Sequence, residues 1–276
     1  MKIYVQPEAR VSREARLDLR CRLDDFYRNV PDYSAFHESS NQVPCWEQVA
    51  RELHRRIQQN GEPHILLRVL EVGAGRSGFG NWLLEQGIRD RFHWTAQDVT
   101  DQNLPWLAEH ADVLHIGDVS SLDLAQSFDI IFSTYVLEHI TDPVSHLNTL
   151  HTLLRPGGSL LIFCPRYDVP GYLAPSCRHL GRLTRLRISL TVAWHRIQTL
   201  LTRKSAFLIQ TDLAAFHGPF FTDADAVHWV SEMDLHFWAK RLDSSLKRLA
   251  VGKARFGSKD WVVKNYLTCA VQIQRL

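Results

Sequence analysis

Short apolar segments alternate with amphipathic ones through the middle of the chain. The apolar segments are four to eight residues long, which predicts β-strands buried on both faces. The expected strands are residues 65–72, 92–97, 113–116, 128–133 and 159–164. Residues 78–86 and 144–154 repeat apolar positions at helical spacing and predict helices between the strands. This alternation predicts an α/β protein with a doubly wound parallel sheet.

The segments on either side of this alternation have a different pattern. Residues 1–60 are polar and helical, with Trp46, Val49 and Leu53 at helical spacing. We expect an N-terminal helical preface or lid, a sheet core, a cap insertion, and a return to the sheet core that ends in a strand at 266–273. The four regions have the ranges 1–60, 61–165, 166–221 and 222–276. Ligands of such sheets bind at the carboxyl ends of the strands, so the cap is expected to shape the ligand pocket.

Composition limits the classes of partner. The 276 residues are 45% hydrophobic and 22% charged, with a formal net charge of +2, which offers no broad phosphate-binding face and predicts no nucleic-acid partner. The five cysteines lack zinc spacing, and we expect reduced thiols. The first 20 residues lack the apolar core of a signal peptide, and no later segment has the length of a membrane span. A cytoplasmic location follows as the expectation.

A glycine-rich turn follows the first expected strand. Within residues 69–80, Gly73, Gly75 and Gly78 have the spacing of a turn that lets the backbone approach a nucleoside cofactor and then opens a helix. Asp98 ends the second strand, where a carboxylate can accept hydrogen bonds from ribose hydroxyls. These features suit a nicotinamide cofactor and a methyl donor equally, and both stay open on this evidence.

Further motifs separate the two cofactors. The chain carries an acid two residues before the glycine turn, an Asp after the third strand, an extended fourth-strand motif and a Pro-Gly-Gly turn before the fifth strand. In order they are Glu71-Val72-Gly73-Ala74-Gly75, Gly117-Asp118-Val119, residues 128–140 and residues 154–160. Together with Asp98, these motifs resemble the class I S-adenosylmethionine-dependent methyltransferase family, and in particular its small-molecule branch. The resemblance covers roughly residues 65–165.

The resemblance implies a fold, a cofactor and a reaction. It implies a mostly parallel, seven-stranded Rossmann-like sheet with N-terminal helices and a helical cap. It implies S-adenosyl-L-methionine as methyl donor, with S-adenosyl-L-homocysteine as product, and in-line transfer to a hydroxyl or amine of a small biosynthetic acceptor, such as a natural product, a glycan or a lipid-linked molecule. The implied cofactor-binding residues are Glu71, Gly73, Ala74, Gly75, Asp98, Val99, Asp118, Val119 and Thr134.

Methyl transfer to a hydroxyl also needs a group that accepts the proton. His139 follows the fourth strand and has an ordinary pKa near neutrality, so it is the first candidate, with Tyr135 beside it. In the alternative interpretation, Glu138 and His139 only brace the following helix. The candidates for binding the acceptor are Arg166 and Tyr167 after the fifth strand, and Tyr33 and His37 in the preface.

Residues 222–228 carry two acids and a histidine. A metal site is conceivable there, but Thr222 as N-cap with Asp223 and Asp225 in the first turn of a helix is the better explanation. We therefore expect no metal.

Residues 178–204 form a basic amphipathic helix with no acidic residue. Its apolar residues recur at steps of three and four, and several arginines lie roughly opposite. The apolar residues are Leu180, Leu183, Leu186, Leu190, Trp194, Ile197 and Leu201, and the opposite arginines are Arg178, Arg182, Arg185, Arg196 and Arg203. We expect a cap helix whose leucines pack on the sheet domain or a second subunit. The alternative is a contact with an anionic membrane surface or an acidic carrier.

Two other functions stay open beside methyl transfer. A nicotinamide-dependent oxidoreductase is favoured only by the glycine spacing and Asp98, whereas Glu71, Asp118 and the Pro-Gly-Gly turn disfavour it. A non-catalytic methyltransferase-like scaffold would keep the fold and use the basic insertion for protein contacts.

Overall fold

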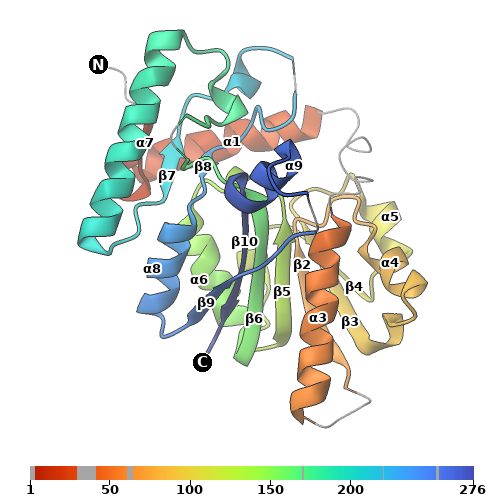
Figure 1. Ribbon diagram of the computed structural model, residues 1–276. Helices are drawn as coiled ribbons and strands as arrows, with labels where there is room; N and C mark the ends of the chain where they lie inside the picture. The colour runs from red at the N-terminus through yellow and green to blue at the C-terminus, as the bar shows by residue number, and fades with distance from the viewer. Residues whose placement is uncertain (1–3, 30–41, 61–64, 170, 220, 253–254) are drawn as a thin grey trace.

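A seven-stranded, mostly parallel sheet forms the centre of the molecule (Figure 1). The computed structural model describes residues 4–29, 42–60, 65–169, 171–219, 221–252 and 255–276. The strand order is β4-β3-β2-β5-β6-β10-β9. The strands are β2 Leu67–Val72, β3 Phe92–Asp98, β4 Val113–Ile116, β5 Phe128–Thr134, β6 Leu154–Pro165, β9 Ser245–Arg248 and β10 Thr268–Gln274. The first five in chain order are parallel, and β10 runs antiparallel to β6 and β9. The predicted fold class is confirmed.

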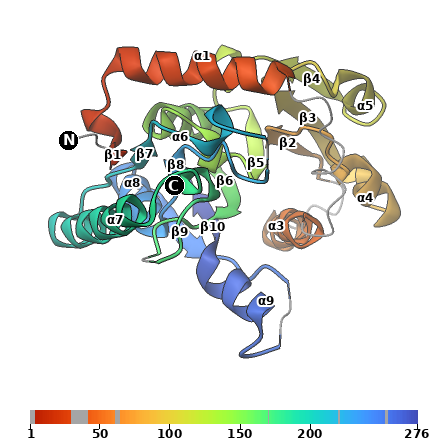
Figure 2. The same cartoon turned by 90° about the horizontal axis from the view of Figure 1, so that it is seen from above.

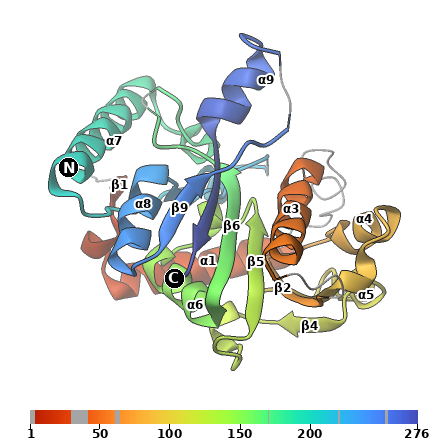
Figure 3. The ribbon, with the colours of Figure 1, turned by 60° about the horizontal axis from the view of Figure 1, so that its bottom comes forward.

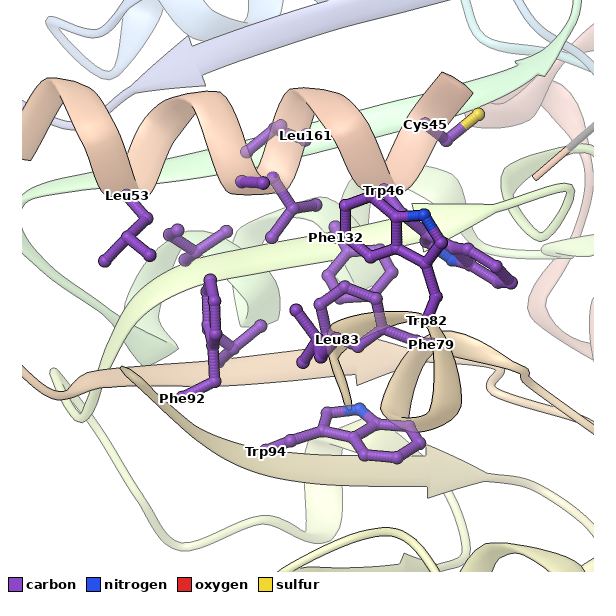
Figure 4. Packing of buried hydrophobic residues seen from close by; sticks show 14 of the residues in the cluster. Cys45, Trp46, Leu53, Phe79, Trp82, Leu83, Phe92, Trp94, Phe132 and Leu161 are labelled. Atoms are coloured by element: carbon purple, nitrogen blue, oxygen red, sulfur yellow. The ribbon is translucent and has the colours of Figure 1, made fainter. Parts of the chain in front are cut away.

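Helices cover both faces of this sheet, as Figures 1 and 3 show. One face carries α3 Val43–Asn60, α4 Phe79–Glu85 and α5 Leu104–Ala108, and the other carries α6 Pro143–Leu153 and α8 Glu232–Arg241. On the first face, aromatic rings interlock between the elements (Figure 4): Phe79 of α4 lies edge-on to Trp94 of β3 and to Phe132 of β5, with centroids 5.6 Å and 4.9 Å away. This rigid core fixes the carboxyl ends of β2, β3 and β5 relative to one another.

A second, smaller sheet joins the N-terminus to the cap. It has the order β1-β7-β8 and is antiparallel, with β1 Val5–Pro7, β7 Leu208–Gln210 and β8 His228–Trp229. The hydrophobic pattern does not predict it, because strands of two or three residues are too short to show a period. The pairing brings the start of the chain to the cap, so α1 Arg13–Asn29 then runs across the carboxyl ends of the central strands (Figure 2).

The remaining elements are short connections apart from one long helix, α7 Arg182–Thr202. The short elements are η1 Glu8–Arg10, η2 Arg89–Arg91, η3 Val119–Ser121, η4 Leu137–His139, η5 Pro175–Cys177, η6 Ala214–Phe216, α9 Lys259–Val262 and the π-helical η7 Val263–Leu267. Among the described residues, no helix combines the length and the apolar character needed to cross a membrane.

The predicted helix start at Thr222 is wrong. Residues 222–225 form a turn, and Asp223 has a left-handed φ of 59° that a first helical turn does not contain. The helix starts ten residues later, where the Ser231 hydroxyl accepts a hydrogen bond from the Met233 N–H and caps α8. The intervening residues are held in β8, so tertiary pairing overrides the local capping pattern.

The expected packing of the α7 leucines on the sheet domain is wrong, whereas their packing on a second subunit stays a prediction. The apolar positions expected to pack inward are exposed; they are Leu183, Leu186, Leu190, Trp194, Ile197 and Leu201. The buried side contains Ile188, Val192 and Arg196, and the helix continues through Ser189 without a break. Arg196, expected in solvent, forms a buried ion pair with Asp234, with a distance of 2.6 Å between Nη1 and Oδ2.

Candidate active site

A cavity of 630 Å³ lies at the carboxyl ends of the central strands, under α1. Its lining falls into two parts. The donor half consists of Gly73–Gly75, Gln97–Thr100 and Asp118–Ser120. The acceptor half consists of Tyr27, Tyr135, His139, Thr222, Asp223 and Asp225. Most of the residues predicted to bind the cofactor therefore line one side of a single cavity, with His139 and Tyr135 in its other half.

The glycine turn of the donor half requires glycine for steric reasons. Gly73 and Gly75 have φ values of 64° and 54°, in the left-handed region. A Cβ on Gly73 would lie 2.5 Å from Cγ2 of Val136, which is shorter than any ordinary contact. The loop therefore presents bare backbone to the cavity, as a site for a nucleoside cofactor requires.

Two side chains at the end of β3 hold this loop in place. The Gly75 N–H donates to Asp98 Oδ2 at 2.7 Å, and the Gly73 N–H donates to Gln97 Oε1 at 3.1 Å. The other Asp98 oxygen accepts from the Thr100 N–H at 3.0 Å. Burial raises the pKa of Asp98 against the effect of these bonds. Asp98 lines the cavity, as predicted, and it also braces the glycine turn.

Glu71 lies behind the loop and does not line the cavity. Its side chain is buried, and Oε1 accepts a hydrogen bond from the Ser77 hydroxyl at 2.9 Å. The same hydroxyl accepts from the Phe79 N–H at the start of α4, so the acid supports the loop from below. Burial raises the pKa of Glu71 to about 8. The structure therefore gives Glu71 a contact within the loop, and its contact with the cofactor stays a prediction.

The rest of the donor half comes from the ends of β3, β4 and β5. Val99, Val119 and Thr134 line the cavity. Asp118 Oδ2 lies 2.7 Å from Nη2 of Arg20 on α1. Although partial burial opposes its charge, hydrogen bonds from Ser120 and the Arg20 charge hold the pKa of Asp118 below its usual value. This partly exposed ion pair connects the helix over the cavity to the donor half.

The end of β5 carries a backbone outlier. Tyr135 has a φ of 58°, although it is not glycine, and its N–H donates to the Phe163 carbonyl of β6 at 2.7 Å. Such strained residues concentrate at functional sites. Burial raises the pKa of the Tyr135 hydroxyl, which keeps it protonated at neutral pH and argues against Tyr135 as a proton acceptor.

His139 lies beside a carboxylate that sequence reasoning assigned to a helix. Its Nδ1 is 3.0 Å from Oδ2 of Asp225, and the Tyr27 hydroxyl donates to the same Asp225 oxygen at 2.7 Å. Two contacts hold the segment there: the Val227 N–H donates to the Glu138 carbonyl at 2.8 Å, and His228 Nδ1 lies 3.0 Å from the Leu137 carbonyl oxygen. The turn at 222–225 thereby places the Asp225 carboxylate beside the His139 imidazole.

The charges around His139 shift several pKa values. Burial opposes a charged imidazole, but the carboxylate of Asp225, followed by Glu138 and Asp223, raises the pKa of His139 to about 10. Burial likewise opposes the charge on Asp225, yet His139 and Tyr27 hold the pKa of Asp225 below its usual value. Burial raises the pKa of Glu138 to about 8, although His139 acts in the opposite direction. His139 and Asp225 therefore form an ion pair.

Two of the predicted acceptor-binding residues, Arg166 and Tyr167, do not line the cavity. Tyr167 is buried, and its hydroxyl donates to Asp223, so it holds a cavity residue in place. Arg166 donates through Nε to Asp168 at 3.1 Å and lies 3.7 Å from Glu232, so it makes structural contacts, and its role as an acceptor ligand stays a prediction. Tyr33 and His37 lie outside the described residues.

Sequence reasoning missed several cavity residues. Tyr27 and Arg20 come from α1, and Asp223 and Asp225 come from the turn that was predicted as a helix start. A second histidine, His146 of α6, also lines the cavity, and burial lowers its pKa to about 4, so it is neutral at pH 7. The acids near the glycine turn were visible as motifs, whereas these residues carry no local signal.

Some of these side chains could also ligate a cation. Among the described residues, Glu138, His139 and Asp223 bring ligand atoms within 4.8 Å of one another, as do His179, Asp212 and His217 in the cap. In the first group, His139 already lies beside Asp225, and the pKa of Glu138 favours its neutral form near pH 7. A protonated imidazole and a neutral carboxyl are poor ligands for a metal ion, so the ionic state of the first group disfavours cation binding.

Comparison with known proteins agrees with the geometry. Residues 70–162 match the family model of a methyltransferase domain. A ubiquinone biosynthesis O-methyltransferase of Ruegeria pomeroyi is 31% identical over 118 residues, covering 40% of this chain and 46% of that protein. One of Caulobacter sp. is 32% identical over 131 residues, covering 43% and 50%. The chain thus spans about half the length of the curated relatives it matches.

Solved structures extend the likeness to the fold. An S-adenosylmethionine-dependent methyltransferase from Mesorhizobium loti has a TM-score of 0.50 at 17% identity, covering 86% of this chain and 99% of that one. The 1,6-didemethyltoxoflavin-N1-methyltransferase of Burkholderia thailandensis, solved with its substrate and S-adenosylhomocysteine, has a TM-score of 0.52 at 14% identity, covering 95% and 88%.

The parallel sheet, the glycine turn and the acids at the strand ends define a nucleoside-cofactor protein of the Rossmann-like class. Residues 70–162 are similar to a methyltransferase domain, and the solved structures show that the chain shares the fold of S-adenosylmethionine-dependent methyltransferases. The nicotinamide alternative is thereby disfavoured.

Proposed function

We propose that this chain transfers a methyl group from S-adenosylmethionine to a hydroxyl group of a small biosynthetic molecule. The observation that carries the proposal is the His139–Asp225 pair in the same cavity as the glycine turn. A natural product, a glycan or a lipid-linked molecule all remain possible acceptor classes, as does an amine in place of the hydroxyl.

The donor half has the features that the cofactor needs. S-adenosylmethionine, when bound, supplies an electrophilic methyl group on a positively charged sulfur. The bare backbone of Gly73–Gly75 accommodates close approach, and Asp98 and Asp118 offer carboxylates at the edge of the cavity. These residues bind and orient, and orientation of the two reactants accounts for much of the rate in a direct displacement.

The acceptor half contains a side chain that can accept the proton of the hydroxyl group. The hydroxyl of an acceptor must lose its proton as the oxygen attacks, and His139 is the group we assign to take it. Asp225 at Nδ1 stabilises the imidazolium that forms, which is how carboxylate–imidazole pairs work in other enzymes. Nε2, 3.9 Å from Oε1 of Glu138, is the nitrogen that we assign to take the proton. Because the pair also raises the pKa of His139, the proton-accepting form becomes more populated as the pH rises.

A hydroxyl is favoured over an amine by the same pair. An unprotonated amine attacks before it loses a proton and needs no base in that step. The names of the relatives that match the sheet core support this choice, because they are O-methyltransferases.

The proposal is tested with a donor that carries a labelled methyl group, incubated with a panel of phenols, sugar alcohols and amines. Label is expected in a hydroxyl acceptor. His139→Gln is expected to lower kcat by about 10²–10⁴-fold, the usual range for loss of an acid–base group, with little change in S-adenosylhomocysteine affinity. His236→Gln, an exposed histidine of α8, is the matched control and should keep the wild-type rate.

Three results would contradict the proposal. Label found only in amines, at a rate that His139→Gln does not change, would favour N-methylation without a base. Stabilisation by NADH but not by S-adenosylhomocysteine in a thermal-shift assay would favour an oxidoreductase. Binding of S-adenosylhomocysteine with no label transferred to any acceptor in the panel would favour the scaffold interpretation.

A further inference from the structure

The outer face of α7 carries a continuous apolar stripe. Leu183, Leu190, Trp194 and Leu201 have exposed fractions of 76%, 63%, 58% and 77%, and Leu186 and Ile197 lie beside them with 57% and 49%. These positions recur every three or four residues along a helix of 21 residues, so they share one side. Contiguous apolar surface of this kind marks an interaction site in a folded protein. Figures 2 and 3 show α7 at the outer edge of the molecule.

The helix is held with this side outward. On the opposite side, Ile188 and Val192 belong to a buried cluster with Ala226 and Trp229. Arg196 is locked to Asp234, whose carboxylate also accepts hydrogen bonds from the backbone N–H groups of residues 206 and 207 at 2.7 Å and 3.1 Å. Successive anchors at steps of four residues fix the rotation of the helix about its axis, so the leucines cannot turn inward without breaking a buried ion pair.

The charge around the stripe is of one sign. Between Asp168 and Asp212 the chain has no acidic residue, and it has six arginines and one lysine. Arg182, Arg187, Arg203 and Lys204 are exposed at the flanks and at the end of the stripe. We propose that α7 docks this protein on an anionic lipid surface, with the apolar stripe in the boundary between head groups and acyl chains. Apolar side chains between basic residues, with a tryptophan among them, suit that boundary.

A second copy of the chain fits this surface less well. The stripe has the spacing of a helix-pairing seam, but pairing two copies of α7 would bring arginines near arginines, with no carboxylate on either helix to offset them. An anionic lipid surface supplies the missing negative charge. Charge complementarity therefore selects the lipid surface.

Helix α7 packs close to the acceptor half of the cavity. Ala226, which packs in the same cluster as Ile188 and Val192, directly follows Asp225, the carboxylate beside His139. The proposal itself does not rest on methyl transfer, because vesicle binding is measured without donor, acceptor or turnover.

The test is flotation of the full chain with vesicles at low salt. One set contains phosphatidylcholine alone, and the other contains about one third phosphatidylglycerol. We expect about tenfold more protein on the anionic vesicles, with loss of binding at high salt. The double variant Leu190→Gln/Trp194→Gln is expected to lower the bound fraction about tenfold. The matched control is Leu66→Gln/Leu84→Gln, which changes two other exposed leucines, with exposed fractions of 55% and 61%, and should float like the wild type.

Other results would overturn the proposal. Equal flotation of the wild type and the Leu190→Gln/Trp194→Gln variant, or no binding of the wild type to anionic vesicles, would exclude docking of α7 on a lipid surface. If light scattering shows a wild-type dimer that the Leu190→Gln/Trp194→Gln variant does not form, and the wild type does not bind vesicles, then the stripe binds a second copy of the chain. A melting temperature that falls strongly in the stripe variant but not in the control would mean that the stripe is packed inside the protein.

Discussion

The donor half and the acceptor half of the cavity are built in different ways. The donor half comes from three consecutive strand ends between Gly73 and Ser120, and its central feature is a backbone loop that only glycine permits. The acceptor half joins side chains from α1, η4 and the turn at 222–225, and its closest contacts, such as Tyr27 to Asp225, span 198 residues of sequence. One half is local in sequence, and the other is assembled by tertiary structure.

This difference has a chemical meaning. A glycine turn at a strand end that allows close approach of a cofactor serves any reaction that uses the same cofactor, so the donor half identifies the cofactor and leaves the acceptor open. The side chains of the acceptor half carry the titratable groups, and their shifted pKa values mark the place of the chemistry. The two halves should therefore fail separately when they are mutated.

The largest effect is expected in the acceptor half, from Asp225→Asn. The amide keeps the shape but removes the charge that stabilises the imidazolium, so at pH values near 10, where the wild-type imidazole is unprotonated, kcat should fall by about 10²–10⁴-fold. Without that charge, burial lowers the pKa of His139, so the wild-type rate should rise with pH towards about 10 whereas the variant levels off at lower pH. Rate measurements across pH, with exposed Asp123→Asn as control, test this. Equal losses of S-adenosylhomocysteine affinity and kcat would show that the halves do not act separately.

A smaller effect is expected in the donor half, from Gly73→Ala. The left-handed φ and the contact with Val136 impose strain of about 1–3 kcal/mol, which corresponds to roughly 5–150-fold weaker binding of S-adenosylhomocysteine in a calorimetric titration. Gly157→Ala is the matched control, because its φ is 73° but a Cβ there meets no atom within 4 Å and the site is outside the cavity lining. It should lose stability and keep its affinity. Similar affinities for both variants would refute a role of the turn in binding.

The smallest effect concerns Glu71, behind the donor half. Its folded-state pKa is raised to about 8, so the stability that its neutral form contributes is complete below about pH 4.5 and is lost as the pH rises through 8. Glu71→Gln removes the cost of a buried charge and should raise the free energy of unfolding at pH 9 by about 1–3 kcal/mol, with no gain near pH 4.5. Denaturant titrations at both pH values measure this. A large loss of S-adenosylhomocysteine affinity in this variant would instead return Glu71 to the cofactor contact that the family resemblance implies.

The difference between the donor half and the acceptor half also explains how much of the structure could be predicted from the sequence. The strands, the glycine turn and the acids Asp98 and Asp118 follow from local patterns that physical chemistry restricts to few structures. The carboxylate partner of His139 could not be predicted, because Asp225 lies where a helix cap was equally consistent with the sequence, and short β8 pairing decided the outcome. The rotation of α7 was mispredicted for a related reason. Its hydrophobic periodicity marks an apolar side without saying what that side faces, and the buried Arg196–Asp234 pair turned it outward.

The central claim is that the acceptor half holds a histidine whose basicity is set by Asp225. Titration of the His139 imidazole by NMR in the wild type and in Asp225→Asn tests it without knowledge of the acceptor. The expected pKa is about 10 in the wild type and clearly lower in the variant, because Asp225 makes the largest contribution that opposes the effect of burial. A wild-type pKa near or below 6.5 that Asp225→Asn leaves unchanged would contradict the account.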